Sequence, residues 1–567
     1  MTETTFLFSS GTGSMGWITD GAPMVEAPEP HTYRNQGVLG HIENNTMDIK
    51  RILELDLEGE AAEVIDILLS VEAFESRLLE EFSPLMRISR FMAQHRSALE
   101  ESGVTAVQKE RDFGTNYMPV FTVPKKDETL RFIQDCRHLN RHFMKPPPMH
   151  LPRIHDVIDH MMTNEFFAVC DARSMFYQIP LCPDTYKYFG LILGGGRGRL
   201  EHAVMTKLPM GFSWAPAIAQ RISNVLMRGV GLAWVDNYCL TGKTLTEFEE
   251  HRHIFLQRIA KDGGCNVVVD DTELKPMMQG ETLGIEFDLA AKRYRMSEKW
   301  STKIRETVVP EDWTARTYSQ IMGNVIWCSH VIKRGLCHQP HAMAVLGEIM
   351  RMISNKEIKW DECCTRKVTP TAVEELRKLM ALMGENPWIQ WSAPSAHDVE
   401  IWSDASDTHA AYLIVQQQKV IAALVRETRG EHIFLEELSI ALDAIEEASR
   451  IGARKAKLFI DNAPAGGAID KNVSTNFTAN VRLAKRSTLP VDTRWVSTKQ
   501  QLADPYTRGR PVPISRPAGS DSIRIRIGIG SESARIRIGI GFGSESDRNR
   551  IGFDSGSDSD SIRVRPI

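Results

Sequence analysis

Two strand-like apolar runs that lead to an aspartate constrain this chain most strongly. The run FFAVCDA places Asp171 directly after apolar and β-branched residues, and LAWVDNYCLTG places Asp236 inside a second such run. Read alone, such an aspartate is usually a cap or a turn former. Two of them facing a common cleft would repel each other unless a divalent cation neutralised them. Because carboxylates offer only oxygen ligands, the pair predicts a Mg²⁺ or Mn²⁺ site suited to phosphoryl transfer.

The composition is that of a large globular protein. With 567 residues, of which 42% are hydrophobic and 25% charged, the chain has apolar material for several domains. No apolar run approaches the roughly 18 residues of a membrane helix, and the first residues lack the pattern of a secretory signal. Nine cysteines without C-x-x-C pairs indicate reduced thiols. We therefore expect an intracellular protein, in the cytoplasm or the nucleus, with no membrane partner.

The texture of the sequence changes along the chain and predicts a multidomain α+β protein. The predicted segments are a loose leader over 1–45, a helical extension over 46–103, a β-rich α+β region over 104–300, a largely helical region over 301–395, an α/β domain over 396–510 and a low-complexity tail over 511–567. The tail repeats RIRIGIG between Gly- and Ser-rich stretches, and such sequence buries too little apolar area to order itself. We assign the tail no fold.

Two local patterns have ordinary structural interpretations. The stretch GGGRGR at 194–199 lacks a following Gly-Lys-Ser/Thr, so it predicts the tip of a β-hairpin and not a phosphate-binding loop. The adjacent carboxylates Asp270 and Asp271 predict a solvated turn and not a metal site.

Four motifs, in order and spacing, resemble the fingers and palm of retroelement reverse transcriptases. They are RFIQDCRHLN (131–140), FFAVCDARSMFYQIPL (166–181), LPMGFSWAPAIAQ (208–220) and LAWVDN (232–237), followed by ETLGIEF. The resemblance implies a right-hand polymerase, with fingers and palm over 104–300 and thumb and connection over 301–395. It also implies that Asp171 and Asp236 hold two Mg²⁺ or Mn²⁺ ions.

The same resemblance implies the residues that bind the incoming nucleotide. Lys126 and Arg131 would reach its triphosphate, which suits an ammonium and a bidentate guanidinium. Phe176 falls where the family has a bulky side chain that excludes a ribose 2′-hydroxyl, so dNTPs are the expected substrates. Met210 and Gly211 lie in a loop that would support template and nucleotide just before a helix opening at 215–216. Many family members have Gln at the position of Met210, a change that would tune nucleotide contacts.

Asn237 is the main departure from the family. Members usually have a second aspartate there, and the amide keeps an oxygen within metal range but removes a negative charge. Since Asp171 and Asp236 can in principle carry both ions, we expect a weakened metal site in an active enzyme. The alternative is a decayed or co-opted element protein that binds nucleic acid without polymerising.

A second set of acids resembles a ribonuclease H domain. IWSDAS contains Asp404, FLEELSIALDA a helical glutamate, LFIDNA Asp461 and QLADPYTR Asp504. Of two adjacent helical glutamates, the small helix face that follows favours Glu437, which leaves Glu436 as a solvated neighbour. The resemblance implies that these four acids hold two Mg²⁺ or Mn²⁺ ions and cleave the RNA strand of an RNA–DNA hybrid.

Together these resemblances predict a reverse transcriptase with a ribonuclease H-like α/β domain. The ending of the second domain is most similar to that of retrotransposons of the tyrosine-recombinase, DIRS-like type. The expected partners are an RNA template, a DNA primer, the RNA–DNA hybrid and dNTPs. The net charge of −5 excludes a uniformly basic surface but leaves room for a local basic groove. The sequence does not set the oligomeric state.

Overall fold

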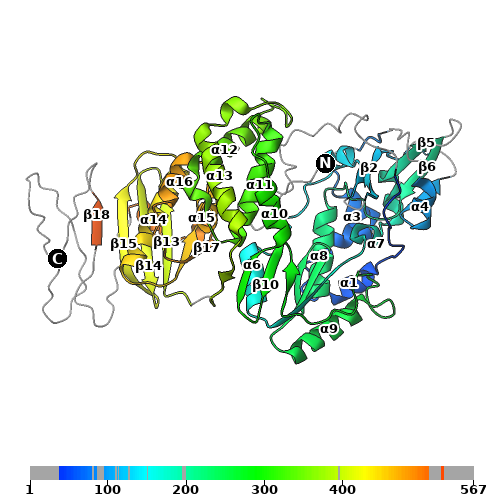
Figure 1. The fold of residues 1–567 in the computed structure, drawn as a ribbon, viewed down its shortest axis with the longest axis horizontal. Coiled ribbons are helices and arrows are strands. Elements are labelled where there is room, and N and C mark those ends of the chain that lie inside the picture. The colour runs from blue at the N-terminus through cyan, green and yellow to red at the C-terminus, as the bar shows by residue number, and fades with distance from the viewer. Residues whose placement is uncertain are drawn as a thin grey trace, which may run out of the picture. The chain divides into compact units, whose positions relative to one another are not determined.

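The protein divides into two compact units in the computed structural model (Figure 1). The first unit comprises residues 1–395 and 467–485, and the second comprises 396–466 and 486–567. The structure describes residues 37–79, 82–85, 95–108, 112, 114–125, 128–149, 151–194, 200–393, 396–509 and 525–528. No helix among these residues combines the length and the apolar character needed to cross a membrane.

The predicted helical extension is built from short helices that belong to the core of the first unit. These are α1 (Ile49–Leu55), α2 (Ala62–Ile65), a 3-10 turn (Asp66–Leu68), α3 (Val71–Glu75) and α4 (Arg96–Glu101). The Asp48 side chain caps α1 by accepting the main-chain N–H of Arg51 at 3.0 Å. The apolar faces of these helices, such as Ile52 and Phe74, are buried in the same core as the central strands. The amphipathic pattern is therefore satisfied by packing against the central strands of the first unit.

The next region contains two small antiparallel sheets. One has the strand order β1-β6-β5, and the other is the hairpin β2-β3. The bounds are β1 (Thr105–Gln108), β2 (Val120–Pro124), β3 (Leu130–Gln134), α5 (Arg137–Arg141), β5 (Gly190–Gly194) and β6 (Leu200–Met205). Gly194 pairs with Leu200, so the segment over 194–199 connects a hairpin as predicted, although residues 195–199 lie outside the described part.

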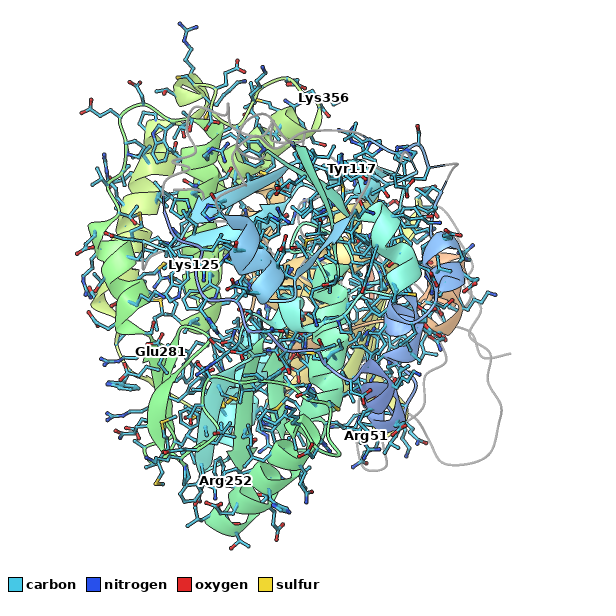
Figure 2. All side chains as sticks on the ribbon, turned by 90° about the vertical axis from the view of Figure 1, so that its right-hand side faces the viewer. Arg51, Tyr117, Lys125, Arg252, Glu281 and Lys356 are labelled. Atoms are coloured by element: carbon cyan, nitrogen blue, oxygen red, sulfur yellow. The ribbon has the colours of Figure 1, made fainter. Side chains whose placement is uncertain are left out.

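A three-stranded antiparallel sheet with the order β4-β8-β7 forms the centre of the first unit. One face carries Tyr238 and Leu240 into a core shared with two helices, and the other carries Phe167 and Cys239 into a second core. The elements are α6 (Ile154–Met162), β4 (Phe166–Asp171), α7 (Met175–Gln178), a 3-10 turn (Pro183–Tyr188), α8 (Ala215–Met227), β7 (Gly231–Trp234), β8 (Asn237–Gly242) and α9 (Leu245–Ile259). Figure 2 shows Arg252 on the outer helix α9, well away from Lys125 after β2.

The region over 301–395 is largely helical, as predicted, and packs with a four-stranded sheet of order β12-β11-β10-β9. Its elements are β9 (Gln279–Thr282), β10 (Ile285–Asp288), β11 (Arg293–Met296), α10 (Glu298–Glu306), α11 (Ala315–Val331), a 3-10 turn (Leu336–His338), α12 (Pro340–Ser354), a second 3-10 turn (Thr365–Lys367), α13 (Pro370–Glu385) and β12 (Ile389–Gln390). Figure 1 shows α11, α12 and α13 side by side.

Residues 467–485 also belong to this first unit, although the chain on both sides of them lies in the second. Helix α16 (Phe477–Leu483) contacts α12 and the turn Leu336–His338. The Cys337 N–H donates to the Asn472 carbonyl at 3.0 Å. A Cβ on Gly347 would lie 2.8 Å from the Thr475 side chain, so the two segments approach closely.

The second unit is a mixed sheet with the order β17-β16-β13-β14-β15-β18 and one long helix packed on it. Strands β13, β14 and β15 are antiparallel, whereas β16 and β17 run parallel to β13. The elements are β13 (Val399–Ala405), β14 (His409–Gln416), β15 (Lys419–Glu427), α14 (Ile433–Arg450), β16 (Ala456–Ile460), β17 (Val491–Trp495), a 3-10 turn (Thr498–Gln500), α17 (Asp504–Thr507) and β18 (Ile525–Gly528). Helix α15 (Ala463–Lys471) begins in this unit and ends in the first one.

Strand β18 comes from the low-complexity tail, to which the sequence assigned no fold. It pairs in parallel with β15. The edge strand of a sheet presents unpaired main-chain groups, and a short β-prone stretch can satisfy them without a core of its own. The remainder of the tail lies outside the described residues.

Two candidate carboxylate sites

The first candidate site lies where strands β4 and β8 pair. Asp171 is the last residue of β4, and the register places it directly opposite Asn237, the first residue of β8. Directly opposed residues share one face of a sheet. Asp236 precedes Asn237, whose Nδ2 donates a 3.2 Å hydrogen bond to Asp236 Oδ1. The structure therefore brings together three residues that the sequence placed in two separate stretches.

The turn that carries Asp236 is strained and is held by α8. Val235 has a φ of 56°, in the left-handed region that β-branched residues rarely adopt. Such a conformation costs about 1–3 kcal/mol. The Val235 N–H donates to Gln220 Oε1 at 2.7 Å, and Ser223 Oγ donates to the Val235 carbonyl. Gln220 and Ser223 are buried, so the helix fixes the turn and with it the position of Asp236.

A third carboxylate, that of Asp270, flanks Asp171. The Asp171 N–H donates to Asp270 Oδ1 at 2.7 Å, and the Asp270 N–H donates to the Asp171 carbonyl at 2.9 Å. Asp271 behaves as the solvated turn that the sequence predicts, with its Oδ1 accepting the Glu273 N–H at 2.8 Å. The turn interpretation missed the role of Asp270, because its contact is with a strand far away in the chain.

Both carboxyl groups of the first site resist ionisation. Partial desolvation of its carboxyl by the surrounding protein, followed by the neighbouring charges of Asp236 and Asp270, raises the pKa of Asp171 to about 6, although the residue keeps an exposed surface. Burial also raises the pKa of Asp236, although its hydrogen bonds and the charge of Arg131 oppose that shift. A bound divalent cation relieves this repulsion, so the donor set fits such an ion.

The residues predicted to bind nucleotide surround this site in part. Arg131 is exposed on β3, and its charge acts on Asp236. Phe176 on α7 and Met210 are half-buried against the core of the first unit. Lys126 lies outside the described residues. The charge of Arg131 thus reaches the carboxylates, whereas Phe176 and Met210 are partly exposed residues at the surface of the core.

Gly211 holds the loop before α8 against the β2-β3 hairpin. A Cβ at this position would lie 1.9 Å from the Gln134 carbonyl oxygen, so a side chain is excluded. Asn140 clamps the same loop, because its Nδ2 donates to the Gly211 carbonyl at 3.0 Å and its Oδ1 accepts the Ser213 N–H at 2.9 Å. Helix α8 begins directly after this loop, as predicted.

Gln178 is a buried amide that the sequence did not mark as important. Its Oε1 accepts the Val268 N–H and Asn45 Nδ2, both at 2.9 Å, and its Nε2 donates to the carbonyls of Arg173 and Val268. The amide therefore ties the turn after Asp171 to the segment that leads to Asp270. Its only sequence signal is a polar residue between apolar ones.

The second candidate site gathers acids from several elements of the second unit. Asp404 lies on β13, Glu437 on α14 and Asp461 directly after β16. One carboxylate oxygen of each lies within 4.8 Å of the others, a group that could hold a metal ion. Asp504 starts α17, its charge acts on Asp404, and its Oδ1 accepts Arg508 Nε at 2.9 Å. Three of the four predicted acids therefore come together, with Asp504 beside them.

Burial and mutual repulsion raise the pKa values of this cluster. Burial, followed by the charges of Asp404 and Asp461, raises the pKa of Glu437 to about 9. Burial also raises the pKa of Asp404 to about 6, against a 2.9 Å hydrogen bond from Thr507 Oγ1 to its Oδ2. Glu437 Oε2 is buried and has no hydrogen-bond partner among the described residues. Since buried polar atoms are normally paired, this oxygen fits a cation as its partner.

The prediction that Glu436 is solvated is wrong. Glu436 is 1% exposed, and its carboxylate forms a 3.2 Å ion pair with Arg426 Nη1. It also accepts main-chain N–H groups of Arg429 and Glu431. The first turn of α14 lies under the end of β15, so both glutamates are buried, one against a guanidinium and one against carboxylates.

Two further residues orient Asp461 and were missed by the sequence analysis. Thr498 Oγ1 donates to Asp461 Oδ2 at 2.9 Å, and Trp495 Nε1 donates to the Asp461 carbonyl at 2.8 Å. Both lie in or next to the segment that follows β17. No motif marks them, since their role depends on how this segment folds back on β16.

The pKa of Glu437 predicts how the metal-free protein responds to pH. A carboxyl whose pKa is raised in the folded state contributes stability at low pH, and that contribution is lost as pH rises from about 4.5 through the folded value of about 9. We expect the melting temperature of the second unit without metal to fall between pH 5 and pH 9. Glu437→Gln should flatten this dependence in thermal unfolding experiments, and added Mg²⁺ should oppose it. An equally steep dependence in the variant would contradict the assignment.

Comparisons with known proteins bear on the first site. Residues 123–286, which include Asp171 and Asp236, match a family model described as reverse transcriptase (RNA-dependent DNA polymerase). The chain is similar to the Transposon Tf2-7 and Tf2-8 polyproteins of Schizosaccharomyces pombe, with 22% identity over 307 residues. The match covers 53% of this chain and 21% of each polyprotein, so the chain spans about a fifth of the length of these relatives.

Two solved structures of the foamy viral protease-reverse transcriptase are also similar. The dRH form in complex with ds DNA has a TM-score of 0.45 and 14% identity, covering 74% of this chain and 72% of that one. The complex with RNA/DNA hybrid has a TM-score of 0.42 and 15% identity, covering 78% and 59%.

Proposed function

Because residues 123–286 form a retroelement reverse transcriptase domain, we propose that this chain is an RNA-directed DNA polymerase that copies retroelement RNA into DNA. The observation that carries the proposal is the convergence of Asp171 and Asp236 at the paired ends of β4 and β8. The Ala172 N–H donates to the Asp236 carbonyl at 2.7 Å, which joins the two main-chain segments that carry the carboxylates, and the charge of Asp236 acts on Asp171.

The residues of the first site divide the work of nucleotidyl transfer. Asp171 and Asp236 would hold two Mg²⁺ or Mn²⁺ ions, with the Asn237 amide oxygen as a weak neutral ligand. When bound, such ions activate an attacking hydroxyl and stabilise the leaving oxygens of an in-line displacement. Arg131, together with Lys126, would bind the triphosphate of a dNTP. Phe176 would exclude a ribose 2′-hydroxyl.

The loop with Met210 and Gly211 would support the templating base and the nucleotide. Its close contact with the Gln134 carbonyl makes it rigid, and Met210 offers an apolar surface beside it. The nucleic acids bound at this site would be an RNA template and a DNA primer, which together form an RNA–DNA hybrid.

We further propose that the second unit is a ribonuclease H that cleaves the RNA strand of the hybrid. Asp404, Glu437 and Asp461 would hold two divalent cations, with Asp504 completing the donor set. The unpaired Glu437 Oε2 in a group of oxygens within 4.8 Å supports this proposal. The same ion chemistry would apply here to hydrolysis of a phosphodiester.

Primer extension on a poly(rA) template with an oligo(dT) primer tests the polymerase proposal. We expect dTTP incorporation with Mg²⁺ and with Mn²⁺. Binding of the template-primer without any incorporation would contradict it and would favour the alternative, a decayed or co-opted element protein. That alternative is motivated by Asn237.

Asn237→Asp is expected to strengthen the first site. The added carboxylate lies on the same sheet face as Asp171 and next to Asp236, so it increases the negative charge available to a cation. We expect the Mg²⁺ concentration for half-maximal extension to fall several-fold, on the order of 10-fold for one nearby charge. A Mg²⁺ titration of initial extension rates measures this. An unchanged titration would place Asn237 out of range of the ions.

A further inference from the structure

Asp270 grips the strand end that presents Asp171. The two residues exchange main-chain and side-chain hydrogen bonds, with Asp171 N–H to Asp270 Oδ1 at 2.7 Å and Asp270 N–H to the Asp171 carbonyl at 2.9 Å. Ala172 bridges to Val269 in the same ladder. The N–H of Ala172 also donates a hydrogen bond to the Asp236 carbonyl. Asp171 thus lies between Asp236 and Asp270.

The nearby cation Arg173 contacts the main chain of Asp270 and the carboxylate of Glu43. Arg173 Nη2 reaches the Asp270 carbonyl at 3.4 Å, and Arg173 Nη1 is 3.9 Å from Glu43 Oε2. The charge of Arg131 acts on Asp236. Asp270 is exposed, as is Asp171, and the charge of Asp270 is felt by Asp171.

Asn237 lies opposite Asp171 on β8 and lacks the negative charge that an aspartate would have there. Asp270 supplies a negative charge beside Asp171 from a segment outside β8. We propose that Asp270 is a positioning residue that holds Asp171 for metal binding and supplies negative charge in place of a carboxylate at position 237. Asp270 acts through Asp171, because its Oδ1 is occupied by the Asp171 N–H. This inference rests on the proposed polymerase function of the first site.

The two parts of this role separate by substitution. Asp270→Asn retains an oxygen that accepts the Asp171 N–H but removes the charge, whereas Asp270→Ala removes both. Asp271→Asn is a matched control, since it deletes the neighbouring exposed charge while keeping the oxygen that accepts the Glu273 N–H. A change seen with Asp270→Asn and not with Asp271→Asn therefore reports the position of the charge.

The experiment measures Mn²⁺ binding to the full chain without nucleic acid, by electron paramagnetic resonance. All variants carry Asp404→Asn and Glu437→Gln, so that the second site does not contribute. We expect Asp270→Asn to weaken Mn²⁺ binding by about 10-fold, the range found for groups that support a metal ligand. Asn237→Asp combined with Asp270→Asn should restore it. Asp270→Ala should weaken binding at least as much and also lower the melting temperature.

Mn²⁺ affinity of Asp270→Asn within twofold of the Asp271→Asn control would overturn the inference. If Asn237→Asp does not restore Mn²⁺ binding to the Asp270→Asn variant, the charge of Asp270 does not take the place of a carboxylate at position 237. Asp171→Asn separates these outcomes from failure of the proposed function. If Asp171→Asn abolishes Mn²⁺ binding and extension while Asp270→Asn changes neither, the polymerase site stands and the inference fails. If Asp171→Asn changes neither, the polymerase site itself is wrong.

Discussion

Primer extension by Asp171→Asn should fall at least about 100-fold, because even residues that only support a metal ligand change activity by about 10- to 100-fold. The substitution keeps the shape of the side chain but removes the charge, and Asp236 alone would then have to hold the cations. The Asp171 main chain continues to pair with β8 and with Asp270. The fold is therefore expected to survive, which circular dichroism and the melting temperature check.

The control for this variant is Asp262→Asn, which removes an exposed carboxylate of the same unit after α9. It should extend primers at the parental rate. Hybrid cleavage by Asp171→Asn should also stay at the parental rate, because the second unit has its own carboxylates. Extension by Asp171→Asn at more than a tenth of the parental rate would exclude it as a metal ligand.

Cleavage of an RNA–DNA hybrid by Glu437→Gln should likewise fall at least about 100-fold while primer extension is retained. Glu437 contributes a buried oxygen that no described residue pairs with, and the neutral amide of glutamine cannot replace its charge toward a cation. The same change removes the repulsion with Asp404 and Asp461, so the melting temperature without metal should rise at pH 8. Loss of activity with a gain in stability is the signature of a ligand, since a merely structural residue would lose both.

Glu446→Gln is the matched control on the same helix, because Glu446 is exposed near the end of α14. It should change neither cleavage nor the melting temperature. Glu436→Gln should behave in the opposite way to Glu437→Gln and lower the melting temperature, because it weakens a buried ion pair with Arg426. Full cleavage by Glu437→Gln would remove this residue from the nuclease site.

Much of the fold could be predicted from the sequence. The α+β class follows from the texture of the sequence, and the motifs that resemble a reverse transcriptase lie in the region that matches a reverse transcriptase family model, residues 123–286. Asp171 and Asp236 stand out because each is a lone carboxylate in an apolar run.

The remainder depends on contacts between distant segments. Asp270 lies 99 residues from Asp171, and only the hydrogen bonds between the two residues reveal that it is more than a turn residue. Gln178 and Gln220 are neutral amides in apolar surroundings, and their partners are main-chain groups that no motif records. Glu436 is predicted to be solvated because the small helix face after Glu437 resembles that of the family, and this resemblance does not reveal the guanidinium that Arg426 brings to Glu436.

Residues 467–485 return to the first unit between two segments of the second, and this limits how the two units can be exchanged by recombination. The chain passes between the two units three times, at 395–396, 466–467 and 485–486. A single recombination event upstream of residue 396 would replace the whole second unit and, with it, the α16 segment that contacts α12 of the first unit. The two units are therefore interleaved in the sequence, and an exchange that keeps both intact must move them as one block or break the chain at all three junctions.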